Sequence, residues 1–169
     1  YRGVGKSKPA SLKHFHMGYL DWAYMDLAAA VDHMHTGDTP LFMVGHSFGG
    51  HALGLLPNQH MVPAFYCFGS GAGWAGWMPP LERWRVRFMW NIFLPMLVAA
   101  KGYLAWKRLG MGEDLPVGVY RQWRHWCQFR HYFFDDPLMA HVAQRFERVT
   151  MPMVAATAMD DAWATPASV

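Results

Sequence analysis

The stretch LFMVGHSFGG, residues 41–50, constrains the fold of this chain more than any other part of the sequence. It begins with a short apolar run, Leu41 to Val44, that has no polar face and is typical of a strand buried on both sides of a parallel sheet. The run breaks into glycines around Ser47 and continues into helix-compatible residues that end at Pro57. This order of strand, tight turn and helix predicts a serine hydroxyl raised above the edge of a sheet.

The glycines around the serine give the turn a steric explanation. Gly-x-Ser-x-Gly is weak evidence alone, because both residue types are common, so the strand before it and the helix after it carry the prediction. We expect side chains at Gly45 and Gly49 to collide with neighbouring backbone, and Gly50 to let the helix start close to the strand. Ser47 is then a candidate nucleophile, and the N–H of Phe48 is expected to point at a developing oxyanion.

A candidate acid lies in the stretch AMDDAWATP near the C-terminal end. Asp160 and Asp161 follow a predicted strand, Met153 to Ala158, at the edge where parallel sheets place their ligands. One of them would orient a histidine that activates the serine, although an aspartate pair is also consistent with a turn or a helix cap. No histidine follows Asp161, so we expect the base to lie beyond Val169, unless the chain is a hydrolase that has lost it.

His46 lies next to the serine but is not the expected base. Successive side chains on such a tight turn diverge, so His46 is predicted to line a substrate pocket or to have a structural role.

Further predicted elements complete the fold class. A helix is predicted from Leu20 to His35 and a second strand from Ala64 to Phe68. Strands separated by helical segments indicate right-handed crossovers and a parallel sheet, so the prediction is an α/β fold.

About 80 residues separate the second and third predicted strands, too many for a simple crossover. This insertion is expected to be helical, with one helix from Leu81 to Ala105 that is kinked at Pro95 and another that begins near Pro116. The predicted organisation has three parts: the first part of the sheet domain at 1–71, a helical cap at 72–148 and a return to the sheet at 149–169.

The aromatic and methionine content is high, with nine Trp, eleven Phe, seven Tyr and thirteen Met. This content favours an apolar cavity or an apolar lid, and a Met-rich core explains it equally well. Trp74 and Trp123, within the insertion, are candidates to line an apolar acyl pocket, and a place in the core of the insertion is the alternative.

Charge and cysteine content argue against several other classes. The net charge of +3 comes from scattered basic residues, which indicates solvated helix faces and not a nucleic-acid site. The two cysteines have no zinc-ligand spacing and form no disulfide framework, so we predict no metal, no cofactor and a reducing compartment, the cytoplasm. The most apolar segment, Phe88 to Ala100, is shorter than the ~20 residues needed to span a bilayer. No oligomeric state is predicted.

Taken together, the stretches YRGVGKS, VGHSFGG and MDDAWATP resemble the α/β-hydrolase superfamily, near the serine aminopeptidase and monoglyceride-lipase type. Over longer stretches the chain is similar to a bacterial group of predicted α/β hydrolases with unassigned substrates. These stretches are YRGVGKSKPASL, DWAYMDLAAAVD, VGHSFGGHALGLLPN, GMGEDLPVGV and WRHWCQFRHYFFDDP.

The resemblance implies a partial α/β-hydrolase fold with a helical cap. Ser47 matches the nucleophile and the N–H of Phe48 matches one half of the oxyanion hole. Asp161 matches the acid better than Asp160, because it precedes a short x-x-A-P run, although Thr165 stands where that run often has proline.

The resemblance also implies that the second oxyanion donor comes before Tyr1 and the histidine after Val169. The chain thus resembles the interior of such an enzyme. The expected activity is a serine hydrolase acting on an ester or amide of an apolar acyl group, a small-molecule substrate. An acyltransferase with the same serine and a non-catalytic binding protein on the same scaffold are the alternatives.

Overall fold

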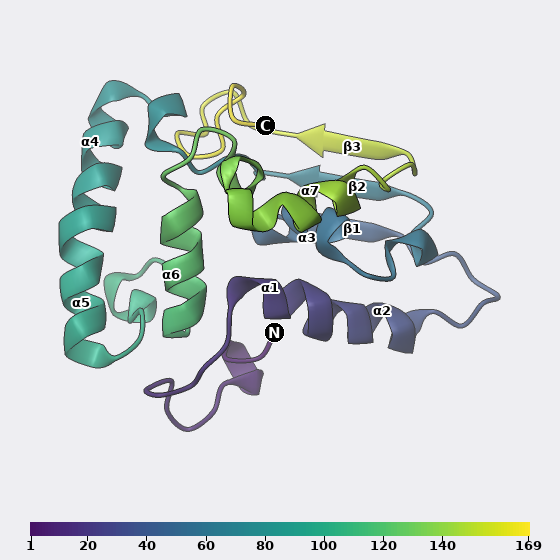
Figure 1. Cartoon of the computed structure of the whole chain (residues 1–169), viewed down its shortest axis with the longest axis horizontal. Helices are drawn as coiled ribbons and strands as arrows, with labels where there is room; N and C mark the ends of the chain where they lie inside the picture. The colour runs from purple at the N-terminus through teal and green to yellow at the C-terminus, as the bar shows by residue number, and fades with distance from the viewer.

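The computed structural model describes residues 1–169 as an α/β fold with one three-stranded parallel sheet (Figure 1). The strands β1 (Met43–His46), β2 (Phe65–Phe68) and β3 (Met153–Ala156) lie in the order β1-β2-β3. The three strands predicted from the sequence are present within one or two residues of their predicted starts, and the predicted α/β class is confirmed.

Seven α-helices accompany the sheet, and two pairs of them are joined end to end by π-helical segments. They are α1 (Tyr19–Asp21) and α2 (Ala28–Met34), joined by Trp22–Leu27; α3 (Phe48–Leu55); α4 (Pro80–Phe88) and α5 (Leu94–Lys101), joined by Met89–Phe93; α6 (Val117–Trp126); and α7 (Ala140–Phe146).

Figure 1 shows α4 and α5 running as one continuous helix through the predicted kink site. Pro95 directly follows the π-helical segment between α4 and α5. Proline lacks an N–H, and its ring clashes with the carbonyl one turn earlier. The wider π-helical turn before Pro95 therefore has a steric cause. No helix of the structure combines the length and the apolar character that crossing a bilayer requires.

Only one face of the sheet is covered. Phe65 and Cys67 of β2 are buried in a small core that also contains Val31 of α2 and Leu53 of α3. The opposite face carries exposed apolar side chains from all three strands, namely Val44, Tyr66, Phe68 and Val154. The prediction that the first strand is buried on both sides was therefore wrong, because the helices that pack on this sheet lie on one side of it.

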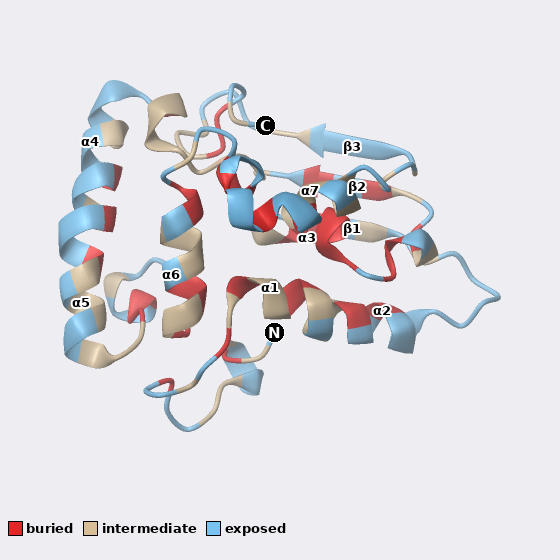
Figure 2. Cartoon of the chain, viewed as in Figure 1, coloured by how far each residue is buried: buried red, intermediate tan, exposed pale blue.

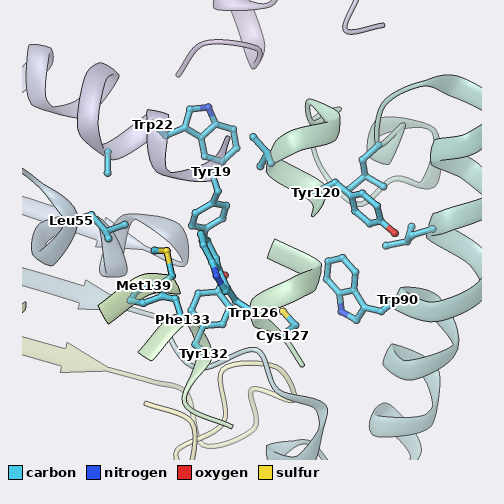
Figure 3. Close-up of a cluster of buried hydrophobic side chains, with 14 of the residues drawn as sticks. Tyr19, Trp22, Leu55, Trp90, Tyr120, Trp126, Cys127, Tyr132, Phe133 and Met139 are labelled. Carbon is cyan, nitrogen blue, oxygen red and sulfur yellow. The ribbon is translucent and has the colours of Figure 1, made fainter. Parts of the chain in front are cut away.

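A larger core unites the insertion with the N-terminal part of the chain. Figure 3 shows Tyr19 between Trp22 and Trp126, and the rings of Tyr19 and Trp126 meet edge to face at 5.4 Å. Leu55 of α3 and Trp90 of the long helix belong to the same cluster of 19 buried residues. Figure 2 shows the corresponding buried strips on the inner sides of α4, α5 and α6. The insertion therefore shares one core with α1 and α3.

The helix α3 begins close to β1 and β2. A Cβ atom on Gly45 would lie 2.8 Å from the N atom of Gly50 and nearer still to the carbonyl group of Gly49. A Cβ atom on Gly50 would overlap the side chain of Ser70. The steric expectation is confirmed for Gly45 and Gly50. It was wrong for Gly49, because a Cβ atom there meets nothing within 4 Å.

These two glycines give a matched test of the turn. Gly45→Ala should lower the free energy of unfolding by about 3 kcal/mol or more, because backbone atoms must move to admit the methyl group. Gly49→Ala should leave it unchanged or raise it by up to about 1 kcal/mol, through helix propensity. Urea unfolding of both variants measures the difference, and equal stabilities would contradict the close approach of α3.

His51 connects α3 to the larger core. Its ring stacks on Tyr132 at 5.0 Å and meets Phe133 edge to face at 5.6 Å. The Nδ1 atom is shielded from solvent and has no hydrogen-bond partner. Burial disfavours the imidazolium form and lowers the pKa of His51 from 6.5 to about 4.

This lowered pKa predicts a stability that depends on pH. Below pH 6.5 the unfolded chain binds a proton at His51 that the folded chain does not bind until about pH 4. The free energy of unfolding should therefore fall by about 3 kcal/mol as the pH drops through this window. His51→Gln should remove that part of the dependence in urea titrations, and His60→Gln, at an exposed position, should keep it. A dependence that His51→Gln leaves intact would contradict the assignment.

Candidate active site

Ser47 has a strained backbone conformation. It connects β1 to α3 with φ 53° and ψ −115°, and its side chain is exposed. A positive φ is unfavourable for a residue with a Cβ atom, and such strain costs on the order of 1–3 kcal/mol and persists only where the surrounding structure imposes it. The sequence folds this way because Gly45 and Gly50 allow the helix to start against the strand.

Hydrogen bonds fix the backbone on both sides of the serine. The N–H of Ser47 donates to the carbonyl of Phe68 at 3.3 Å, which ties the turn to the end of β2. The carbonyl of Ser47 accepts from the N–H of Gly50 at 3.0 Å and from the hydroxyl of Ser70 at 2.9 Å. Sequence reasoning missed Ser70, although its place in the GSG stretch directly after the second strand was a signal.

Phe48 is the first residue of α3, so its N–H belongs to the helix start, where backbone donors have no acceptor within the helix. The phenyl ring packs edge to face against Tyr19 at 4.7 Å and Trp22 at 5.3 Å. The ring thus anchors the first turn of α3 in the larger core, and the helix dipole favours negative charge near the N–H.

Asp161 lies in the turn that follows β3 and is partly buried. Its Oδ1 atom accepts two backbone hydrogen bonds, from Trp163 at 2.8 Å and from Ala164 at 2.9 Å. The Oδ2 atom has no hydrogen-bond partner and is free to accept one. Asp160 is exposed and its carboxylate makes no hydrogen bond. The geometry therefore favours Asp161 over Asp160 as an acid that orients another group.

The carboxyl ends of the three strands converge at one edge of the sheet. A Cβ atom placed on Gly69, directly after β2, would lie 3.2 Å from the ring of His46 and 4.0 Å from Oδ2 of Asp161. The turn that holds Ser47 is hydrogen-bonded to the last residue of β2, Phe68. The end of β1, the end of β2 and the turn after β3 that contains Asp161, which we call the acid turn, thus form one edge.

The His46 ring lies over Phe68, with ring centroids 4.9 Å apart, and is exposed. Because side chains alternate along a strand, His46 shares the uncovered face of the sheet with Val44. No histidine side chain of this chain forms a hydrogen bond with Ser47 or Asp161. None of the ten histidines of the sequence therefore links the two residues by hydrogen bonds in this structure.

An apolar groove of about 490 Å³ begins beside the acid turn. Trp163 lines this groove and donates from its indole Nε1 to Glu82 of α4 at 2.8 Å, which joins the acid turn to the insertion. The other apolar side chains of the groove come from the insertion, and they include Phe88, Met89, Phe93, Leu109 and Met111.

The two tryptophans predicted to bind substrate lie apart from this groove. Trp74 lines a separate cavity of about 220 Å³ together with Arg87 and Arg124. Trp123 packs edge to face against Trp90 at 4.9 Å, inside the insertion. Trp123 therefore has the alternative position considered in the sequence analysis, a place in the core of the insertion.

Metal ligands and reactive thiols are not assembled near the serine. The structure contains no group of three or more His, Cys, Asp or Glu side chains arranged to hold a metal ion. Cys67 and Cys127 are buried and unpaired, and burial raises the pKa of each thiol. Both thiols are therefore protonated at neutral pH and poor nucleophiles.

Comparisons with models of protein families, with curated proteins and with solved structures found no match to this chain.

Proposed function

We propose that this chain carries the nucleophile and the acid of a serine hydrolase of the α/β-hydrolase type. The observation that carries the proposal is the backbone of Ser47, which is strained and exposed between a parallel strand and the helix that follows it. Strained residues cluster at functional sites, because the conformation aims a side chain where regular structure would not. The position of Asp161 at the same sheet edge supports the proposal.

In the proposed reaction the hydroxyl of Ser47 attacks an acyl carbon and its proton passes to a histidine from outside this chain. The free Oδ2 of Asp161 would hold the N–H of that histidine and so fix its orientation. The N–H of Phe48 would donate to the oxyanion of the tetrahedral intermediate. The leaving group takes the proton, and water then cleaves the acyl ester and frees the serine.

The groove beside the acid turn supports an apolar acyl substrate. Seven of its nine lining residues are hydrophobic, and one of them, Trp163, is two residues from Asp161 along the chain. Burying a hydrocarbon chain against these side chains is favourable by about 0.8 kcal/mol for each methylene group. We therefore propose esters of apolar acids as the first substrate class and amides as the second.

The first test is the reaction of the intact protein that contains this chain with a fluorophosphonate probe. Labelling should map to Ser47 by mass spectrometry, vanish in Ser47→Ala and persist in Ser7→Ala, where the serine is exposed at the end of a short 3-10 helix. No labelling of a folded protein would reject the hydrolase and favour a binding protein on the same scaffold. Product analysis with and without an added alcohol then separates hydrolysis from acyl transfer.

The second test compares the two neighbouring aspartates. Asp161→Asn keeps an oxygen to accept from Trp163 and Ala164, so the turn should survive. The rate of hydrolysis of a p-nitrophenyl ester should nevertheless fall by about 10³–10⁴-fold, because the histidine loses its negative partner and correct tautomer. Asp160→Asn should change this rate less than about twofold, as expected of a surface substitution. Equal effects of the two variants would contradict the role of Asp161.

A further inference from the structure

The long helix formed by α4 and α5 is apolar on two opposite sides. Its inner side buries Val86, Trp90 and Leu94 in the larger core, with at most 5% of each residue exposed. Its outer side carries large apolar residues at spacings of three or four, each between 51% and 76% exposed. We call these residues the outer stripe: Leu81, Trp84, Phe88, Ile92 and Met96.

The outer stripe runs along the edge of the molecule. Figure 2 shows the exposed side of α4 and α5 facing away from the rest of the chain, while the buried side faces α6. From Leu81 to Met96 the stripe is about 22 Å long, at about 1.5 Å for each residue. Helices that are apolar all round are normally buried, and an exposed apolar surface of this length indicates an interaction site.

Positive charge flanks the stripe without free negative charge. Glu82 is the only acidic residue from Pro80 to Lys101. Both of its carboxylate oxygens are occupied, one by Arg85 at 2.9 Å and the other by the indole N–H of Trp163 at 2.8 Å. Arg87 is exposed, and its guanidinium carbon lies 5.9 Å from the ring centroid of Trp84. The helix therefore offers apolar and cationic groups side by side.

This combination decides between two kinds of occupant. A second copy of the chain, paired through the same stripe, would bring the cations of two helices together with no carboxylate free to compensate them. An anionic lipid surface supplies both an apolar layer and negative headgroups. Tryptophan next to arginine also suits the boundary between water and hydrocarbon, where amphipathic rings concentrate.

We propose that the outer stripe docks this protein onto the surface of an anionic membrane. The helix lies in the plane of the interface, with the apolar side chains of the stripe among the upper acyl chains and Arg87 at the headgroups. Phe88 and Phe93 also line the groove that leads to Trp163, so docking places the mouth of this groove at the lipid. A lipid-derived ester would then enter the protein through this groove. That step rests on the proposed function, whereas the docking of the stripe does not.

The test is sedimentation of the intact protein with vesicles of phosphatidylcholine, alone or mixed with phosphatidylglycerol. It is done in a Ser47→Ala background, so that no lipid is hydrolysed and the result is independent of catalysis. Partitioning onto the mixed vesicles should exceed that onto phosphatidylcholine by about tenfold and should weaken with added salt. Equal partitioning onto both kinds of vesicle, or none onto either, would overturn the proposal.

A matched pair of triple variants assigns the binding to the stripe. Leu81→Gln, Trp84→Gln and Met96→Gln together should reduce partitioning by about tenfold or more, because less apolar area enters the lipid. The control replaces three apolar residues outside the helix by glutamine. These residues are between 62% and 86% exposed, and they are Met34, Leu138 and Met159. The control should retain partitioning within about twofold, and an equal loss in both variants would contradict the assignment.

Two further measurements complete the test. Arg87→Gln alone should lower the preference for mixed vesicles by several fold, at about 1 kcal/mol for each cation near the surface; this variant leaves the apolar stripe intact and serves if the triple variant fails to fold. Sedimentation velocity without vesicles detects self-association. If the protein forms a dimer that the stripe substitutions dissociate, the stripe binds a second copy of the chain and the lipid proposal is overturned.

Discussion

The close approach of α3 to β1 and β2 is the constraint on which the candidate site depends. It requires the absence of side chains at Gly45 and Gly50, and it leaves Ser47 alone to connect strand and helix. The helix cannot relax away from the sheet, because Leu53 is buried in the small core beneath the strands and Leu55 in the larger core. Packing at two places along α3 therefore sustains a local strain on the order of 1–3 kcal/mol at the serine.

The parts of the site that could be predicted from the sequence have local causes. A glycine before the serine, an apolar run before that glycine and a helix after it define the turn, and the structure has it at Ser47. The position of Asp161 followed from the end of a strand. Gly49 was misjudged because the pattern of glycines does not say which way each Cα–H points, and only the folded turn shows that Gly45 faces the helix.

The parts that could not be predicted depend on contacts between distant segments. Ser70 holds the carbonyl of Ser47 from 23 residues away, and Trp163 reaches Glu82 across 81 residues. The uncovered face of the sheet also could not be predicted from the sequence, because it depends on the positions of distant helices. An apolar run such as Leu41 to Val44 has the same composition whether one face or both are packed, so burial depends on where the other helices lie.

From composition alone, the many tryptophans are consistent with either a core or a binding surface. In the structure, two tryptophans of a single helix differ in burial. Trp90 is 5% exposed and packs in the larger core, whereas Trp84, six residues earlier, is 70% exposed. Because the inner side fixes the helix to the core through Val86, Trp90 and Leu94, the conformation of the helix does not depend on its outer side chains. Their exposure brings no folding stability from burial, and the proposed docking to a lipid surface gives the apolar residues there a physical reason.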